Sequence, residues 1–141
     1  MKRRSLWLPL AFVAGFLAVG LPYWQIPYAK LGLPDALIGP GLLVVAAAAL
    51  LTRAVGGRSL LWTIALVGAS VPCAVMARVI VDAVQDPTSH NLWPIEVVIA
   101  LVLGLCASAA GALFGSLLLR VSGAGASDDS EPRHKQLPRP R

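Results

Sequence analysis

Apolar residues gather in four runs, which are separated by short polar or proline-rich segments. The runs cover about residues 6–22, 36–52, 60–84 and 93–119. A helix needs about 20 mostly apolar residues to cross the ~30 Å hydrocarbon core of a bilayer. The pattern therefore predicts an all-α fold, a four-helix transmembrane bundle. The second run is short for a span, so a re-entrant segment is the alternative there.

Prolines predict where the helices bend or end. Pro72 lies in the middle of the third run and predicts a kink. Pro87 predicts the end of the same helix, because the residue before a proline is biased away from the α conformation. Four prolines within residues 21–40 predict an irregular interfacial loop, in which Tyr23 and Trp24 favour the membrane–water boundary.

The two ends of the chain differ in character from the runs between them. Residues 2–4 are basic and precede the first run, a pattern shared by cleaved signal peptides and by first membrane helices. We favour an uncleaved helix, because no soluble domain follows it. Residues 121–141 are rich in Gly and Ser and then in Pro and Arg, with too few apolar residues to order the segment. We expect a membrane domain over residues 1–120 and a disordered cytoplasmic tail.

The composition agrees with a bilayer as the solvent of this chain. Hydrophobic residues make up 57% of the 141 residues and charged residues only 13%, whereas soluble domains carry about 25% charged residues. A chain of this size cannot hide so much apolar surface in a water-soluble core. The sequence therefore predicts a small integral membrane protein.

The basic residues predict the orientation. Of the 12 Lys and Arg residues, ten fall on the side of the two termini, and Lys30 and Arg78 fall on the other. The ten are Lys2, Arg3, Arg4, Arg53, Arg58, Arg120, Arg133, Lys135, Arg139 and Arg141. Cytoplasmic loops carry an excess of basic residues, so both termini are predicted to be cytoplasmic, in a multi-pass protein of the bacterial inner (plasma) membrane. The basic residues do not form a stripe interleaved with aromatic residues, so we expect no nucleic-acid partner.

Polar residues concentrate in the connection between the third and fourth runs. Arg78, Asp82 and Asp86 are spaced four apart and share one face of a helix. A histidine and a glutamate follow, one in the connection and one where the next helix opens. The predicted outer-face cluster comprises Arg78, Asp82, Asp86, His90, Trp93 and Glu96.

Three interpretations of this cluster remain open. In the first, Arg78 needs a partner at the membrane boundary, and Asp82 or Glu96 supplies it. In the second, carboxylates and an imidazole bind a divalent ion or handle a proton. In the third, the surface recognises a lipid headgroup, a cationic ligand or a partner protein. No ligand motif of recognised spacing is present, so we predict no metal site and no cofactor.

Two family patterns resemble parts of the chain. The spacing of Arg78, Asp82 and Asp86 resembles the second half of the CDP-alcohol phosphotransferase signature, but the Asp-Gly and Ala-Arg elements of its first half are missing. The size and the four spans are similar in outline to small multidrug-resistance transporters. Those proteins need a membrane-embedded glutamate in the first helix, and residues 5–22 contain no acid. We carry over no residue role from either family.

Small residues mark one face of the fourth run. Ala107, Gly111 and Gly115 recur at a spacing of four, which lets another helix approach closely. The sequence leaves open whether this packing face meets the same bundle or a second copy. Cys73 and Cys106 are expected to be buried small apolar residues, because they are too far apart for a CxxC motif.

The sequence favours a non-enzymatic subunit or accessory of a membrane assembly, since it contains no nucleophile–base pair and no phosphate-binding loop. Its expected partners are the lipid bilayer and a protein partner or second copy bound through the fourth helix. The alternative is a small transporter or ion-coupled carrier that uses the acidic cluster. A third hypothesis is a membrane enzyme that uses Asp82, Asp86 and His90. The span centres offer a carrier only Thr63, Ser70, Cys73, Cys106 and Ser108 as polar residues.

Overall fold

The chain folds into α-helices. The computed structural model describes residues 6–27, 32, 35–56, 59–85 and 92–126, and these residues contain no strand. The helices are α1 (Trp7–Gln25), α2 (Pro40–Gly56), α3 (Leu60–Gly68), α4 (Ser70–Gln85) and α5 (Trp93–Ala126). The predicted all-α class is confirmed for the part of the chain that the structure describes.

The helices have the length and composition of membrane spans. Trp7–Gln25, Leu60–Gln85 and Trp93–Val121 are each long and apolar enough to cross a membrane, and Pro40–Val55 is a shorter apolar helix. Large apolar side chains remain exposed on the helix surfaces, among them Leu61 at 76%. These are the features of a multi-pass membrane protein.

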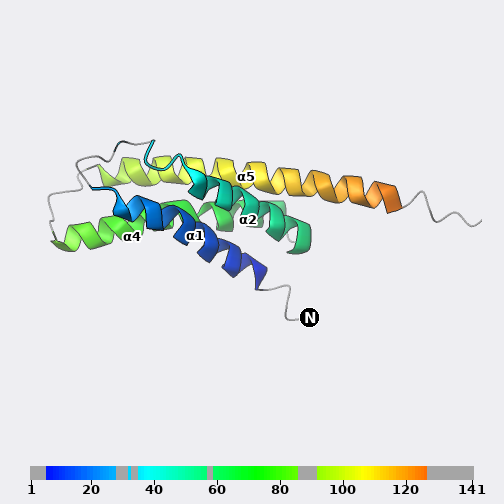
Figure 1. Cartoon of the computed structure of the whole chain (residues 1–141), viewed down its shortest axis with the longest axis horizontal. Coiled ribbons are helices and arrows are strands. Elements are labelled where there is room, and N and C mark those ends of the chain that lie inside the picture. Colours follow the sequence, from blue (N-terminus) through cyan, green and yellow to red (C-terminus); the bar gives the residue numbers. More distant parts are fainter. Residues whose placement is uncertain (1–5, 28–31, 33–34, 57–58, 86–91, 127–141) are drawn as a thin grey trace, which may run out of the picture.

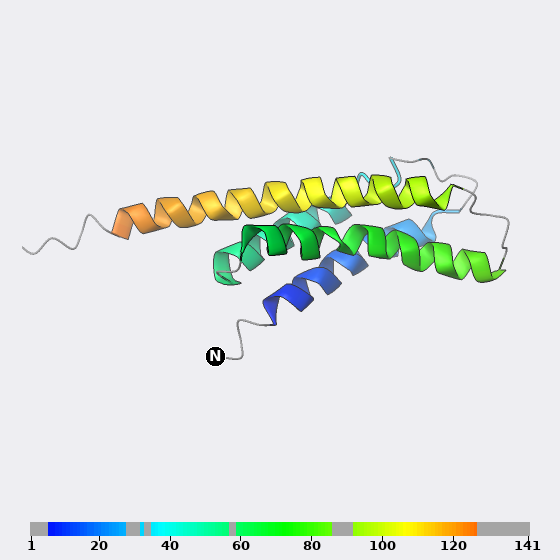
Figure 2. The ribbon, with the colours of Figure 1, turned by 180° about the vertical axis from the view of Figure 1, so that it is seen from behind.

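Helix α5 is the longest element, and α2, α3 and α4 pack along it (Figure 1). Helix α2 and the α3–α4 pair contact α5, and α1 lies against both α2 and α4. The reverse view shows α5 extending past the other helices at its C-terminal end (Figure 2). The fully buried side chains at the centre are small or β-branched, and they include Val45, Ala49, Val67, Val71, Ala74, Val75, Ala100 and Ala112.

The small residues of α5 allow α2 to approach closely. A Cβ atom on Gly111 would overlap the backbone carbonyl of Ala46, and one on Gly115 would lie 2.8 Å from the carbonyl oxygen of Leu50. Ala107 is partly buried against the core. The face that the sequence singled out therefore lies against α2 of the same chain.

The third apolar run is interrupted at a single residue, Ala69, between two helices. Helix α3 ends at Gly68 and α4 begins at Ser70. The break precedes Pro72, because a proline cannot donate to the carbonyl four residues earlier, which is that of Gly68. Hydrogen bonds from the Ala69 N–H to the carbonyl of Ala65 and from the Cys73 N–H to that of Ala69 continue on either side. The chain thus bends where the missing donor falls.

Helix α1 differs from its predicted boundary. The structure continues it through Pro22 to Gln25, so the predicted end at residue 22 and the loop assigned to Tyr23 and Trp24 are wrong. Tyr23 is 1% exposed and belongs to the core. A proline removes one hydrogen bond from a helix without ending it when neighbouring helices support the turn.

The other boundaries shift as well. Helix α2 begins at Pro40 instead of residue 36, with the proline at its first position, where the missing N–H costs least. Helix α5 runs to Ala126, so the tail predicted from residue 121 begins too early. Adding residues to an existing helix costs far less than nucleating one. Residues 127–141 lie outside the described residues.

The two cysteines do not lie in the core. Cys73 and Cys106 are both exposed, contrary to the expectation of buried positions. They form no disulfide with each other. In a membrane span, the apolar exterior accepts a thiol as readily as the interior does, so hydrophobicity does not tell the two faces apart.

Candidate functional site

Helices α1 and α4 end, and α5 begins, at one end of the molecule (Figures 1 and 2). These helix ends carry polar side chains. We call this the polar end and define it by Tyr23, Trp24, Arg78, Asp82 and Glu96. The opposite end, where α2 ends and α3 begins, carries Arg53 and Arg120, and we call it the basic end. The charged residues of the described helices therefore lie near the two ends of the helix bundle.

Arg78 joins two helices at the polar end. Its Nε donates to Asp82 Oδ2 at 3.2 Å, its Nη1 donates to the carbonyl of Tyr23, and its Nη2 donates to the carbonyl of Ile26 at 2.6 Å. The guanidinium also lies 5.0 Å from the centre of the Tyr23 ring. The side chain is only 9% exposed. A cation thus meets the last carbonyls of α1, which carry partial negative charge. The carbonyl of Tyr23 also accepts a hydrogen bond from the Ile26 N–H at 3.3 Å.

Trp24 forms the second link between α1 and α4. Its Nε1 donates to the carbonyl of Ala74 at 3.0 Å. Its ring packs edge-on against Phe16 at 5.5 Å between centroids. It also covers Gly20, where a Cβ would come within 2.8 Å of the ring. Gly20 therefore makes room for the indole to fold back along α1 and reach α4.

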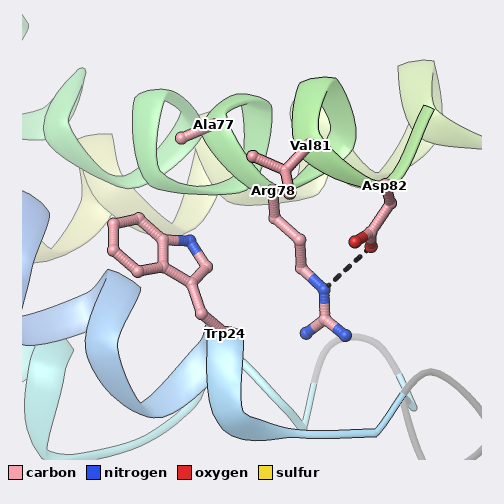
Figure 3. A pocket seen from close by; sticks show the side chains of 5 residues that line it. All are labelled: Trp24, Ala77, Arg78, Val81 and Asp82. Carbon is pink, nitrogen blue, oxygen red and sulfur yellow. Dashed lines mark hydrogen bonds and ion pairs between the residues drawn. The ribbon is translucent and has the colours of Figure 1, made fainter. Parts of the chain in front are cut away.

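A pocket of about 300 Å³ opens between these two links (Figure 3). Its lining consists of Trp24, Ala77, Arg78, Val81 and Asp82. The indole and the two aliphatic side chains form an apolar wall. The Arg78–Asp82 ion pair forms the charged rim, with Asp82 31% exposed. The pocket can hold an apolar group next to a charged one.

The structure brings together part of the predicted cluster. Arg78 pairs with Asp82, the local one of its two predicted partners. Glu96 lies in the first turn of α5 and is 8% exposed, where an acid favours the positive end of the helix dipole. Trp93 begins α5 and is 42% exposed.

Two members of the cluster, Asp86 and His90, lie outside the described residues. Among the residues that the structure does describe, no group of three or more His, Cys, Asp or Glu side chains could hold a metal ion. The metal and proton hypotheses therefore depend in part on Asp86 and His90, which lie outside the described residues.

Sequence reasoning missed the contribution of α1 to this site. The carbonyls of Tyr23 and Ile26 bind Arg78, and Trp24 lines the pocket. A signal was present in Pro27, since a helix that ends just before a proline exposes carbonyl groups that a buried arginine can bind. The sequence could not show that Arg78 binds these carbonyls, because Arg78 lies 52 to 55 positions away along the chain.

The buried hydroxyl groups in the middle of the molecule bind backbone carbonyls. Thr63 donates to the carbonyl of Ser59 at 3.2 Å, and Ser70 donates to that of Val67 at 2.6 Å. Ser108 of α5 lies 3.0 Å from the carbonyl oxygen of Ile64 on α3. These hydroxyls serve helix structure and helix packing.

Comparisons with protein-family models, with curated proteins and with solved structures found no match for this chain. Side-chain chemistry and geometry therefore carry the functional inference.

Proposed function

We propose that this chain is a non-enzymatic accessory subunit of a larger membrane assembly. The observation that carries the proposal is the use of Arg78, whose guanidinium is bound by Asp82 and by the carbonyls of Tyr23 and Ile26. A buried arginine with these partners fixes the arrangement of two helices. Because Arg78 holds α1 and α4 together, it supports a function in which the chain keeps a fixed shape and contacts a partner.

The proposal includes an orientation in the membrane. Four spans, formed by α1, α2, the α3–α4 pair and α5, cross a bacterial inner (plasma) membrane with both termini in the cytoplasm. The distribution of Lys and Arg, ten against two, supports this orientation. The basic end then faces the cytoplasm, and the polar end with its pocket faces outward.

The pocket at the polar end is the surface that we assign to the partner. Its wall of Trp24, Ala77 and Val81 suits an apolar side chain of a neighbouring membrane helix. Its rim carries the Asp82 carboxylate, and the acid Glu96 belongs to the same end. We therefore propose a partner protein whose helix brings a basic residue to the outer membrane boundary, because opposite charges favour docking there.

Affinity purification of the tagged full-length chain in mild detergent tests the proposal. Mass spectrometry identifies co-purifying proteins, and elemental analysis of the same sample measures metal. We expect a protein partner at fixed stoichiometry. A divalent metal that is retained by the wild type and lost in Asp82→Asn contradicts the accessory role and makes the polar end an active or transport site.

The second candidate function is an ion-coupled carrier. The break at Ala69 between α3 and α4 favours it, because broken membrane helices often line substrate sites. The close packing around the break favours the accessory role. A Cβ on Gly15 would lie 2.6 Å from Ser70 Oγ, and one on Gly104 would overlap the carbonyl of Gly68.

Proteoliposomes loaded with a pH-sensitive dye separate the two functions. The accessory role predicts no proton movement beyond that of empty liposomes when a pH or sodium gradient is imposed. Gradient-driven proton flux that Asp82→Asn or Glu96→Gln abolishes supports the carrier.

A further inference from the structure

A second pocket lies at the basic end, between α2, α3 and α5. Its volume is about 540 Å³. Its polar lining consists of Arg53, Ser116 and Arg120, and leucines of α3 and α5, including Leu60, Leu113 and Leu117, form the rest. None of the lining residues within the described part of the chain is acidic. The pocket therefore combines two guanidinium groups with an aliphatic surface.

The arginine of α2 is held in place over this pocket. Arg53 Nε donates to Ser116 Oγ at 2.9 Å, and Ser116 Oγ lies 2.8 Å from the carbonyl oxygen of Ala112, to which it donates. Gly115 lets the two helices approach, since a Cβ there would lie 3.3 Å from the Arg53 Cβ. The hydrogen-bonded chain orients the half-buried guanidinium before any ligand arrives, which reduces the ordering cost of binding.

The leucines open toward the surroundings of the helix bundle. Leu113 is 52% exposed and Leu117 is 56% exposed. A ligand that satisfies both parts of the pocket needs an anionic group for the arginines and an apolar chain for the leucines. A free inorganic anion satisfies only the first part.

The position of the pocket along α5 matches the edge of a bilayer. Glu96 and Arg120 are separated by 24 positions, which corresponds to about 36 Å of helix. The hydrocarbon core is about 30 Å thick. If Glu96 lies at one boundary, Arg120 reaches the headgroup layer at the other. This step rests on the transmembrane arrangement proposed above and not on a protein partner.

We propose that this pocket binds the phosphate group of an anionic phospholipid. Arg53 and Arg120 contact the headgroup phosphate, and Leu113 and Leu117 contact an acyl chain. Basic pockets between membrane helices on the cytoplasmic side are suited to anionic headgroups. Such a bound lipid bridges α2 and α5 where the bundle meets the cytoplasm.

Native mass spectrometry of the full-length chain in detergent tests this site, with phosphatidylglycerol, phosphatidylcholine and inorganic phosphate as separate probes. We expect tighter binding of phosphatidylglycerol than of phosphatidylcholine. Arg53→Gln and Arg120→Gln should each weaken phosphatidylglycerol binding about fivefold, and the double variant about 25-fold. Arg120 is exposed, so Arg120→Gln keeps the test valid if Arg53→Gln does not fold.

The control variant is Gly39→Asp, which lowers the net charge by the same amount at an exposed residue away from the lining residues of the pocket. A side chain there meets nothing within 4 Å, so lipid binding should stay unchanged. Equal losses in the control and in the double variant would show attraction by net charge and overturn the proposal. Phosphatidylglycerol binding that is the same in wild type and double variant also overturns it. Displacement of the lipid by millimolar inorganic phosphate would assign the pocket to a free anion and refute the lipid as ligand.

Discussion

Arg78 illustrates how a charge is accommodated at the edge of an apolar protein. Its local partner, Asp82, follows from the spacing of four in the sequence, and this pair forms at 3.2 Å. Its bonds to the carbonyls of Tyr23 and Ile26 are as important, because they join α4 to α1. An isolated buried charge is costly, and these acceptors offset that cost where α4 meets α1.

Replacing this residue should loosen the polar end. Arg78→Gln removes the cation from Asp82 and leaves the α1 carbonyls with a shorter, neutral donor. We expect the free energy of unfolding to fall by about 2 kcal/mol, which lies between the losses typical of exposed and of buried pairs, because Asp82 is 31% exposed. Arg78→Lys should recover only part of this loss, because an ammonium group cannot reach the same acceptors in a fork.

Thermal unfolding in detergent, followed by circular dichroism, measures both changes. Full stability in Arg78→Gln would contradict the structural role assigned to this arginine.

At the scale of elements, the helical class was predictable from the sequence, and several helix boundaries were not. The apolar runs fixed where helices form, because each is too long and too uniform for another structure in a bilayer. The end of α1 was missed, since Pro22 resembles a stop signal when read without its neighbours. The break at Ala69 was anticipated as a kink from Pro72, and the structure places it at the carbonyl that this proline leaves without a donor.

The approach of α2 to α5 depends on the absence of a side chain at Gly111. In an ordinary helix, replacing Gly by Ala stabilises by about 1 kcal/mol. We expect the opposite sign for Gly111→Ala, a loss of about 2 kcal/mol, because the new methyl group would overlap the backbone of Ala46 and backbone cannot rotate away.

The matched control is Gly39→Ala, because a Cβ atom at Gly39 would meet nothing within 4 Å. This variant should have the stability of the wild type or slightly more. The same thermal unfolding measurement compares the two. A gain of stability in Gly111→Ala would contradict the close contact between α2 and α5.

Pro72 sets the bend between α3 and α4. Pro72→Ala restores an N–H that can donate to Gly68, so the two helices should become more nearly continuous. Spin labels at Leu61→Cys and Val81→Cys, both exposed positions, report the change by electron–electron distance measurement. Cys73 and Cys106 are replaced by Ala in both proteins.

A straight helix would separate these positions by about 30 Å, and the distance should lengthen toward that value in Pro72→Ala. An unchanged distance would show that helix packing, and not the proline, causes the bend.

At the scale of the whole molecule, the polar end and the basic end define an axis, and the sequence predicted which charges belong to each. The sequence predicts Arg53 and Arg120 on one side and Arg78 and Asp82 on the other. The first pair lines the pocket at the basic end and the second pair the pocket at the polar end, and the C-terminal ends of α2 and α4 lie far apart in the bundle (Figure 1). The pockets at these ends were not predictable. Each depends on side chains from helices far apart in sequence, and periodicity does not specify which helices become neighbours.

The proposed orientation places the polar end outside the cell and the basic end in the cytoplasm. Leu92→Cys, just before α5, should react with a membrane-impermeant maleimide added outside intact cells, whereas Ser59→Cys, just before α3, should react only after lysis. Both positions are exposed, and both variants carry Ala at Cys73 and Cys106. The reverse labelling pattern would contradict cytoplasmic termini.

The measurement that tests the central claim most directly is co-purification of the partner protein with a variant whose pocket at the polar end is filled. Ala77→Trp fills the pocket at the polar end without changing charge, and Ala110→Trp adds the same side chain at an exposed site on α5. An accessory subunit that docks through this pocket should lose its stoichiometric partner in Ala77→Trp and keep it in Ala110→Trp. Recovery of the same partner at the same ratio with both variants, or of no partner with the wild type, would contradict the account.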